Sequence, residues 1–169
     1  FSRGEIRQWE MRKNFKNNPK LKFIIGDVRD KERLSISMKN VNIVFHLAAL
    51  KHVPVCEENP GEAVLTNIIG TMNVIDSCLL NEVDYVIDVS TDKAVDPLNL
   101  YGVTKSCAER LCIAANNSFG KTKFVCVRGG NVIGTNGSVV PLFREQILKY
   151  NEVTLTDKRM TRFFITLKQ

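Results

Sequence analysis

The chain has 169 residues, with 24 Lys and Arg against 18 Asp and Glu and a formal net charge of +6. Hydrophobic residues make up 44% of the sequence and charged residues 25%, which is the composition of one ordinary globular domain and excludes a disordered, collagen-like or low-complexity chain. No run of about 18 apolar residues predicts a membrane span, and no signal region is recognisable at Phe1. We therefore expect no membrane partner.

The positive charge gathers at the two ends of the chain, where residues 1–22 carry seven Lys and Arg against two Asp and Glu. No pattern of stacking aromatics accompanies these charges, so we interpret most of them as a solvated helix face and expect no nucleic-acid partner. The five cysteines are odd in number and form no Cys-x-x-Cys pair. This usage predicts no metal site and a reducing, cytoplasmic location.

Strands and helices alternate along the chain. Short apolar runs predict strands, and apolar residues spaced by three and four predict helices. The expected strands cover residues 22–27, 42–49, 84–90, 123–128 and, as a short fifth, 153–155, and the expected helices cover residues 30–39, 60–82, 100–117 and 139–150. Because the strands are continuously apolar, we expect a parallel sheet with helices on both faces, a doubly wound α/β fold of the Rossmann-like type.

Polar residues follow each of the first four expected strands. In a doubly wound sheet, ligands bind beyond the carboxyl ends of the strands, so one site is the economical hypothesis. The residues that would meet there are Gly26-Asp27, Ala48 to His52, Ser90 to Lys93, and Arg128 to Asn131.

Tyr101-Gly-Val-Thr-Lys105 opens the helix after the third strand and places Tyr101 and Lys105 on one helix face. An ammonium beside a phenol favours the phenolate and lowers the tyrosine pKa, so Tyr101 could exchange a proton at neutral pH. Thr91, at the end of the preceding strand, could hydrogen-bond the same substrate oxygen. This combination indicates a redox site.

With these residues the sequence resembles the extended short-chain dehydrogenase/reductase superfamily, and most closely the inverting UDP-N-acetylglucosamine 4,6-dehydratases, which belong to polysaccharide biosynthesis and act in pseudaminic acid formation and flagellin glycosylation. The motifs that carry the resemblance, in order, are Phe1 to Arg3, Gly26 to Asp30, His46 to Pro54, Thr66 to Thr71, Ser90 to Ala94, Leu100 to Lys105, Asn131 to Pro141 and Arg159 to Phe163.

The resemblance implies a mechanism. Tyr101, supported by Lys105 and Thr91, would take the proton of the sugar 4-hydroxyl while hydride passes from C4 to a nicotinamide. Lys93 would then remove the C5 proton, and Asp92 would protonate the departing 6-hydroxyl. Return of hydride to C6 would give a 4-keto-6-deoxy sugar nucleotide with C5 inverted.

The resemblance also implies binding residues. Arg3 stands where NAD enzymes carry an acidic residue and suits a 2′-phosphate, so NADP is favoured over NAD. Asn67 is either a polar bridge to the site or a satisfied core amide, and His46 and His52 are assigned structural roles. The implied cofactor residues are Ser2, Arg3, Asp27, Val28, Ala48, Ala49, Lys51, Asn67, Tyr101 and Lys105, and the implied substrate residues are Lys51, Asp92, Lys93, Arg128, Asn131, Val139 and Arg162.

The family's first strand and Gly-rich phosphate turn have no counterpart in residues 1–169, nor does most of its substrate-capping region. We therefore expect a partial nucleotide-binding domain, truncated at its N-terminus, in which the substrate-binding region begins after about residue 135, and a full-length protein that is a homo-oligomer. Two other functions stay open. A sugar-nucleotide 4-epimerase would share Tyr101 and Lys105 without needing Asp92 and Lys93, and the chain could also be a non-catalytic nucleotide-binding module. Tyr101 argues against the membrane-attached dehydratases that retain C5 configuration.

Overall fold

The fold is taken from a computed structural model that describes residues 1–118, 120–135, 138–166 and 168. Asn136 and Gly137, which belong to one of the motifs quoted above, lie outside the described residues. The chain divides into two compact units, Phe1–Val127 and Arg128–Gln169. Each unit is described by itself.

A three-stranded sheet forms the centre of the first unit, in the order β1-β2-β3. Its strands are β1 (Ile43–His46), β2 (Tyr85–Thr91) and β3 (Lys123–Gly129). Strands β1 and β2 are parallel, with His46 opposite Asp88. These strands confirm the apolar runs expected at 42–49, 84–90 and 123–128.

The N-terminal segment forms a small parallel contact of its own. Ser2 bridges Ile25, so the strand expected over 22–27 is reduced to a single bridge. Helix α1 (Glu5–Asn14) follows and buries none of its residues, which confirms the solvated basic helix. Helix α2 (Lys31–Ser37) begins at Asp30, whose carboxylate accepts a hydrogen bond from the Arg33 amide.

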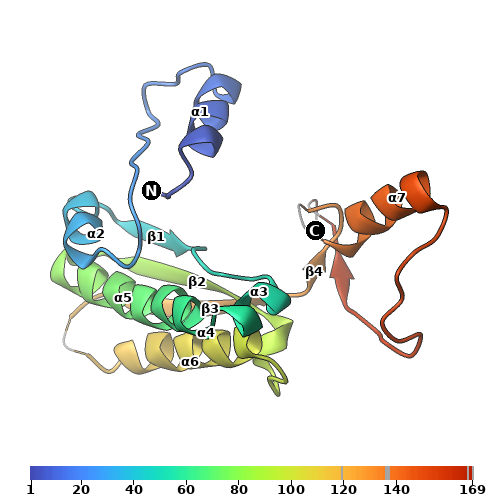
Figure 1. The fold of residues 1–169 in the computed structure, drawn as a ribbon. Helices are drawn as coiled ribbons and strands as arrows, with labels where there is room; N and C mark the ends of the chain where they lie inside the picture. Colours follow the sequence, from blue (N-terminus) through green and yellow to red (C-terminus); the bar gives the residue numbers. More distant parts are fainter. Residues whose placement is uncertain (119, 136–137, 167, 169) are drawn as a thin grey trace. The chain divides into compact units, whose positions relative to one another are not determined.

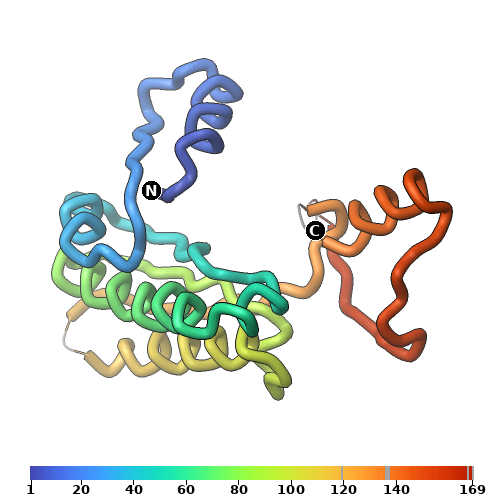
Figure 2. The backbone as a smooth tube through the Cα atoms, in the orientation of Figure 1, coloured from blue at the N-terminus to red at the C-terminus, as the bar shows by residue number. Residues whose placement is uncertain are grey.

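The helix expected over 60–82 is present but contains a π-helical turn. It consists of α4 (Pro60–Val64), the π turn η1 (Leu65–Ile69) and α5 (Gly70–Leu80). Figure 2 shows this run beside the other long helix, α6 (Leu100–Ala115). A shorter helix, α3 (Val53–Glu58), precedes them. π turns interrupt helices mostly at functional positions, and this one carries Asn67.

The core of the first unit lies between these helices and the sheet (Figure 1). Val74 and Cys78 of α5, Val86 of β2, Cys112 of α6 and Phe124 of β3 are all buried there. The cysteines therefore act as small core hydrophobes, as expected.

The opposite face of the sheet stays open within this unit. Phe45, Val89 and Val125 are between 39% and 65% exposed. The expectation that helices cover both faces is therefore met on one face only within residues 1–118 and 120–127.

The second unit contains a parallel pair, β4 (Asn131–Val132) and β5 (Phe164–Ile165), and the helix α7 (Val139–Tyr150), whose bounds match the expectation. The helix ends at Asn151, which adopts the left-handed conformation. The strand expected over 153–155 is wrong: the side chain of Gln146 bonds the main-chain and side-chain groups of Thr154 and holds that segment as a loop. Strand β5 was not expected.

One helical stretch, Pro60–Leu80, is long and apolar enough to cross a membrane by length and composition alone. The sequence predicted no span there, because polar residues such as Asn67 and Asn73 interrupt the apolar run. In the structure this stretch supplies core residues of the first unit, including Val74 and Cys78.

Candidate functional site

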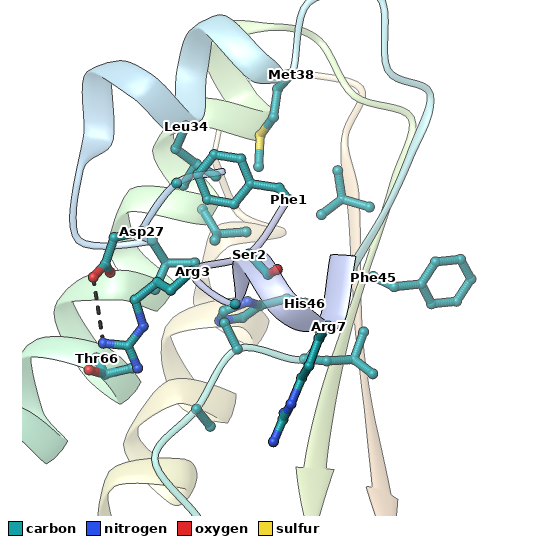
Figure 3. A pocket seen from close by; sticks show the side chains of 18 of the residues that line it. Phe1, Ser2, Arg3, Arg7, Asp27, Leu34, Met38, Phe45, His46 and Thr66 are labelled. Carbon is teal, nitrogen blue, oxygen red and sulfur yellow. Dashed lines mark ion pairs between the residues drawn. The ribbon is translucent and has the colours of Figure 1, made fainter. Parts of the chain in front are cut away.

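A cavity of about 880 Å³ lies in the first unit between the Ser2–Ile25 contact and strand β1. Several of the expected cofactor residues line it, namely Ser2, Arg3, Asp27, Val28, Ala48 and Ala49. Figure 3 shows Phe1 beside Leu34 and Met38, and Arg3 reaching toward Asp27. Six of the ten expected cofactor residues therefore share one cavity, and Lys51, Asn67, Tyr101 and Lys105 are not among the residues that line it.

Arg3 and Asp27 form the charged corner of this cavity. Their closest atoms, Arg3 Nη1 and Asp27 Oδ2, are 3.6 Å apart, and the Arg3 side chain is about half exposed. Arg29 also binds Asp27, and its hydrogen bond, opposed by burial, lowers the pKa of the Asp27 carboxyl. Asp27 therefore stays ionised and partnered, while Arg3 keeps donors available for an anion.

The side chain of Asn67 hydrogen-bonds the main chain of the loop that follows β1. The Asn67 amide accepts from the Leu50 N–H at 2.8 Å and donates to the Leu50 carbonyl at 3.0 Å and to Thr104 Oγ1 at 2.9 Å. Asn67 is thus a satisfied core amide that also ties the Ala48–Lys51 segment to the helix of Tyr101 and Lys105, so both alternatives for this residue describe part of its role.

Thr66, beside Asn67, was assigned no role from the sequence. It lines the cavity, its side chain is buried, and its hydroxyl has no hydrogen-bond partner in the described structure. An orphaned buried hydroxyl costs stability unless a ligand or water satisfies it. Together with the Arg3 guanidinium and the small side chains of Ala48 and Ala49, this hydroxyl gives the cavity groups that can receive an anionic, hydroxyl-bearing ligand such as a nucleotide.

Thr91, Asp92 and Lys93 sit together where β2 ends. The 3₁₀ turn η2 (Asp92–Ala94) begins directly after Thr91, whose hydroxyl donates to Asp92 Oδ1 at 3.0 Å. Lys93 Nζ lies 3.0 Å from the same carboxylate oxygen. Burial raises the pKa of the Asp92 carboxyl, but the bonds from Lys93 and Thr91 outweigh burial and hold that pKa below its usual range.

The turn and the helix α6 approach closely at Gly102. A Cβ at this position would clash with the main-chain oxygen of Lys93 and lie 3.0 Å from Pro97 Cβ. Only glycine allows this approach. The glycine of the Tyr-Gly-Val-Thr-Lys segment therefore brings Asp92 and Lys93 against the helix that carries Tyr101.

The expected lowering of the Tyr101 pKa by Lys105 is not found. Burial raises the pKa of Tyr101, and a hydrogen bond with Thr91 opposes this only in part. Lys105 Nζ instead lies 3.2 Å from Asp88 Oδ1, and both side chains are buried. Asp88 had no role predicted from the sequence, although an acidic residue inside an apolar strand indicates a buried charge that needs a partner.

His46 takes the structural role expected of it, whereas the structural role expected of His52 stays a prediction. His46 is buried, and its Nε2 lies 3.0 Å from Thr71 Oγ1. Burial lowers the pKa of His46 to about 4, so the ring is neutral at physiological pH. His52 is exposed and occupies the N-cap position of α3.

Lys51, expected to contact both cofactor and substrate, is exposed and belongs to the first unit. The remaining expected substrate residues belong to the second unit. Asn131 begins β4 and Val139 begins α7. Arg162 is exposed, and its Nη1 donates to the Thr161 carbonyl at 2.7 Å. Arg128 opens this unit.

A parallel sheet with Thr91 at the end of β2, and with Tyr101 and Lys105 on the helix that follows, is the arrangement of the short-chain dehydrogenase/reductase class of Rossmann-like proteins. Within that class, the chain belongs to the polysaccharide biosynthesis protein family, whose pattern it matches over residues 1–169.

The relatives bear two kinds of activity in their names. The chain is 52% identical to a UDP-N-acetylglucosamine 4,6-dehydratase (inverting) of Campylobacter jejuni, across 99% of this chain and 51% of the relative. It is 49% identical to a UDP-glucose 4-epimerase of Rickettsia rickettsii, across 99% of this chain and 49% of that protein. The chain thus spans about half the length of these relatives.

Solved structures share the fold. A protein named Pen from Bacillus thuringiensis superposes with a TM-score of 0.96 at 46% identity, covering 99% of this chain and 54% of that one. MoeE5, solved with UDP-glucose and NAD, superposes with a TM-score of 0.79 at 25% identity, covering 86% of this chain and 54% of that one. These superpositions confirm the Rossmann-like fold.

Proposed function

We propose that the full-length protein is a sugar-nucleotide 4,6-dehydratase acting on UDP-N-acetylglucosamine, with inversion at C5. The observation that carries this proposal is the Asp92–Lys93 pair, placed by one turn between Thr91 and the helix of Tyr101. A dehydratase needs an acid and a base beside its redox residues, and this turn supplies both. The name of the 52% identical relative supports the same activity.

The redox residues act on the sugar C4. Tyr101 takes the proton of the 4-hydroxyl, and Thr91 hydrogen-bonds the oxygen that becomes the ketone. A nicotinamide cofactor, when bound, would supply the hydride acceptor and the hydride donor that the reaction needs. Because burial raises the pKa of Tyr101, the phenol of the free protein carries its proton. Tyr101 must therefore lose that proton to solvent before it can accept the proton of the 4-hydroxyl.

The elimination needs Asp92 protonated and Lys93 neutral, whereas the structure shows their ion pair at 3.0 Å. The two arrangements contain the same number of protons and differ by one proton transfer along that hydrogen bond. Displacement of water by substrate disfavours the charged form of the pair and so favours the transfer. Lys93 can then take the C5 proton, and Asp92 can give its proton to the departing 6-hydroxyl, which leaves as water.

The cofactor that we propose is NADP. Arg3 carries this choice, because its guanidinium stands at the cavity corner with open donors and suits a phosphate dianion. From the resemblance we propose that Arg128, Asn131 and Arg162 contact the substrate or its diphosphate and that Lys51 and Val139 are further substrate-binding residues. We also propose that the protein is cytoplasmic and homo-oligomeric, with no membrane or nucleic-acid partner.

The alternative activity is a 4-epimerase, which the Rickettsia relative's name favours. An epimerase would use Thr91 and Tyr101 but would leave the Asp92–Lys93 pair without a chemical role. A non-catalytic nucleotide-binding module would leave both the Thr91 and Tyr101 pair and the Asp92–Lys93 pair without a chemical role.

The test is the product formed from UDP-N-acetylglucosamine by the full-length protein with NADP. A dehydratase releases one water and yields a 4-keto-6-deoxy sugar nucleotide, seen as a mass loss and a new ketone or hydrate in the NMR spectrum. An epimerase yields an isomer of unchanged mass, and a binding module yields no product. Either of the last two results would refute the proposed activity.

A further inference from the structure

A buried charge pair lies beneath the redox residues. Asp88, in the middle of β2, is 0% exposed, and Lys105 of α6 is 3% exposed. Lys105 Nζ lies 3.2 Å from one oxygen of Asp88 and 3.4 Å from the other. The two residues come from the two elements that also carry Thr91 and Tyr101.

The pair has consequences for position and for charge. A buried ion pair breaks expensively, because removal of one partner leaves the other charge uncompensated. Lys105 is therefore held at a fixed place by the strand. The pair is also neutral overall, so Tyr101, one helical turn before Lys105, experiences much less positive charge than from a lysine alone.

The other ionisable groups around Asp88 do not replace Lys105 as its partner. Burial lowers the pKa of His46 on β1 to about 4, which leaves the ring neutral. A hydrogen bond with Cys126 of β3, together with burial, raises the pKa of the Cys112 thiol on α6. Glu109 of α6 is also buried and brings no positive charge. The Asp88, Cys112 and Cys126 ligand atoms lie within 4.8 Å of one another, but Lys105 already occupies the carboxylate.

We propose that Asp88 is a positioning residue, which holds Lys105 from the strand side, fixes its ammonium relative to Tyr101 and offsets the positive charge that Tyr101 experiences. The inference rests on the proposed function, in which Tyr101 and Lys105 act together on the sugar. Its chemical consequence is that Tyr101 gives up its proton at a higher pH than it would beside an unpaired lysine. The negative charge of Asp88 does act in this direction on the pKa of Tyr101, after burial and the charges of Asp92 and Cys56.

The experiment uses the full-length protein and the variant Asp88→Asn, which keeps the side-chain volume and an oxygen acceptor for Lys105. The control is Asp76→Asn, because Asp76 on α5 is exposed and pairs with an exposed lysine, Lys31, at 2.6 Å. The ionisation of Tyr101 is followed by tyrosinate absorbance, as the difference between each protein and the same protein carrying Tyr101→Phe. This measurement needs no turnover.

Asp88→Asn is expected to move the ionisation of Tyr101 to lower pH by about one pH unit, and Asp76→Asn is expected to leave it in place. In single-turnover reduction of NADP by UDP-N-acetylglucosamine, the half-maximal rate should move to lower pH in the same variant. Its maximal rate should fall at least about tenfold, because Lys105 is no longer fixed, while sugar affinity stays unchanged.

An unchanged or higher ionisation pH of Tyr101 in Asp88→Asn would overturn the inference. If neither the wild-type protein nor any variant reduces NADP, but Asp88→Asn still shifts the ionisation of Tyr101, the proposed function fails and the role of Asp88 stands. If Asp88→Asn does not fold, Lys105→Met is added to remove the second buried charge. If the double variant folds, the two residues act as a charge pair. If the double variant also fails to fold, the inference that Asp88 acts through Lys105 is overturned.

Discussion

The side-chain amide of Asn67 binds the main chain of Leu50 on both sides, accepting from its N–H at 2.8 Å and donating to its carbonyl at 3.0 Å. This reciprocal contact copies one rung of a β-ladder with a side chain. It fixes the segment Ala48–Lys51 that borders the cavity, although Asn67 itself is buried.

We therefore expect Asn67→Ala to weaken both stability and cofactor binding. The loss of bonds to two partly buried main-chain groups should cost about 1–3 kcal/mol of unfolding free energy, and nicotinamide cofactor affinity should fall with it. Thermal unfolding and fluorescence titration measure the two effects. Asn59→Ala is the control, because Asn59 is exposed and makes one local bond to the Val55 carbonyl. Equal effects of both variants would contradict this role.

Gly102→Ala should separate the acid–base turn from the Tyr101 helix. Its Cβ would meet the main-chain oxygen of Lys93, which cannot rotate away, so either the turn or the helix must shift. Overpacking of this kind costs about 1–3 kcal/mol of stability, and the elimination step should suffer more than cofactor binding. Gly61→Ala, on helix α4 with nothing within 4 Å, is the matched control and should be neutral or stabilising. A fully active Gly102→Ala protein would contradict the close approach.

The stability of the fold should fall between pH 6.5 and 4 because of His46. In the folded state burial lowers the pKa of His46 to about 4, whereas the unfolded chain takes up that proton near pH 6.5. The unfolded state therefore binds more protons in this window, and the folded state loses up to about 3 kcal/mol as the pH falls. Above pH 6.5 His46 contributes no pH dependence.

Chemical denaturation at a series of pH values checks this slope. His46→Gln should flatten the curve between pH 6.5 and 4, while His52→Gln, at an exposed position, should leave it unchanged. The carboxylates with a lowered pKa, such as Asp27 and Asp92, lose their stabilisation only below about pH 4, so they do not mask the effect. An unchanged slope in His46→Gln would show that the ring is not held neutral.

Arg3→Ala should weaken NADP binding more than NAD binding. The variant removes a charge-assisted contact to the 2′-phosphate, which is worth about 1.5–3 kcal/mol, or roughly tenfold to a hundredfold in affinity. Parallel titrations with the two cofactors measure the difference. Arg12→Ala serves as the control, because Arg12 is not among the residues that line the cavity and instead stacks 5.3 Å from the centroid of the Phe23 ring. Equal losses for NADP and NAD would remove Arg3 from the 2′-phosphate.

Local patterns predicted much of this fold. The apolar runs at β1, β2 and β3 and the periodic residues of α6 and α7 place five elements within a few residues of their observed bounds. The failures have non-local causes. Segment 153–155 has strand-like residues, but Gln146 from the preceding helix binds its polar groups. The π turn at Leu65–Ile69 does not interrupt the apolar spacing and so leaves no trace in it.

The site was predictable where its residues lie close in sequence and less so where they pair across the fold. Thr91, Asp92 and Lys93 are contiguous, and the structure keeps them together. The buried partner of Lys105, by contrast, is Asp88, which is 17 residues away in sequence and meets Lys105 only when β2 packs on α6. The i, i+4 spacing on the helix predicted that Lys105 lies near Tyr101, but it could not predict that Asp88 pairs with the charge of Lys105.

The most direct test of the dehydratase proposal is deuterium incorporation at C5 when UDP-N-acetylglucosamine is turned over in heavy water. Tyr101→Phe should stop nicotinamide reduction altogether. Lys93→Ala should still reduce the nicotinamide yet form product about 10²–10⁴-fold more slowly, because no base reaches C5. The wild-type protein should release a 4-keto-6-deoxy product carrying deuterium at C5. A 4-epimer without deuterium at C5, or full product formation by Lys93→Ala, would contradict the account.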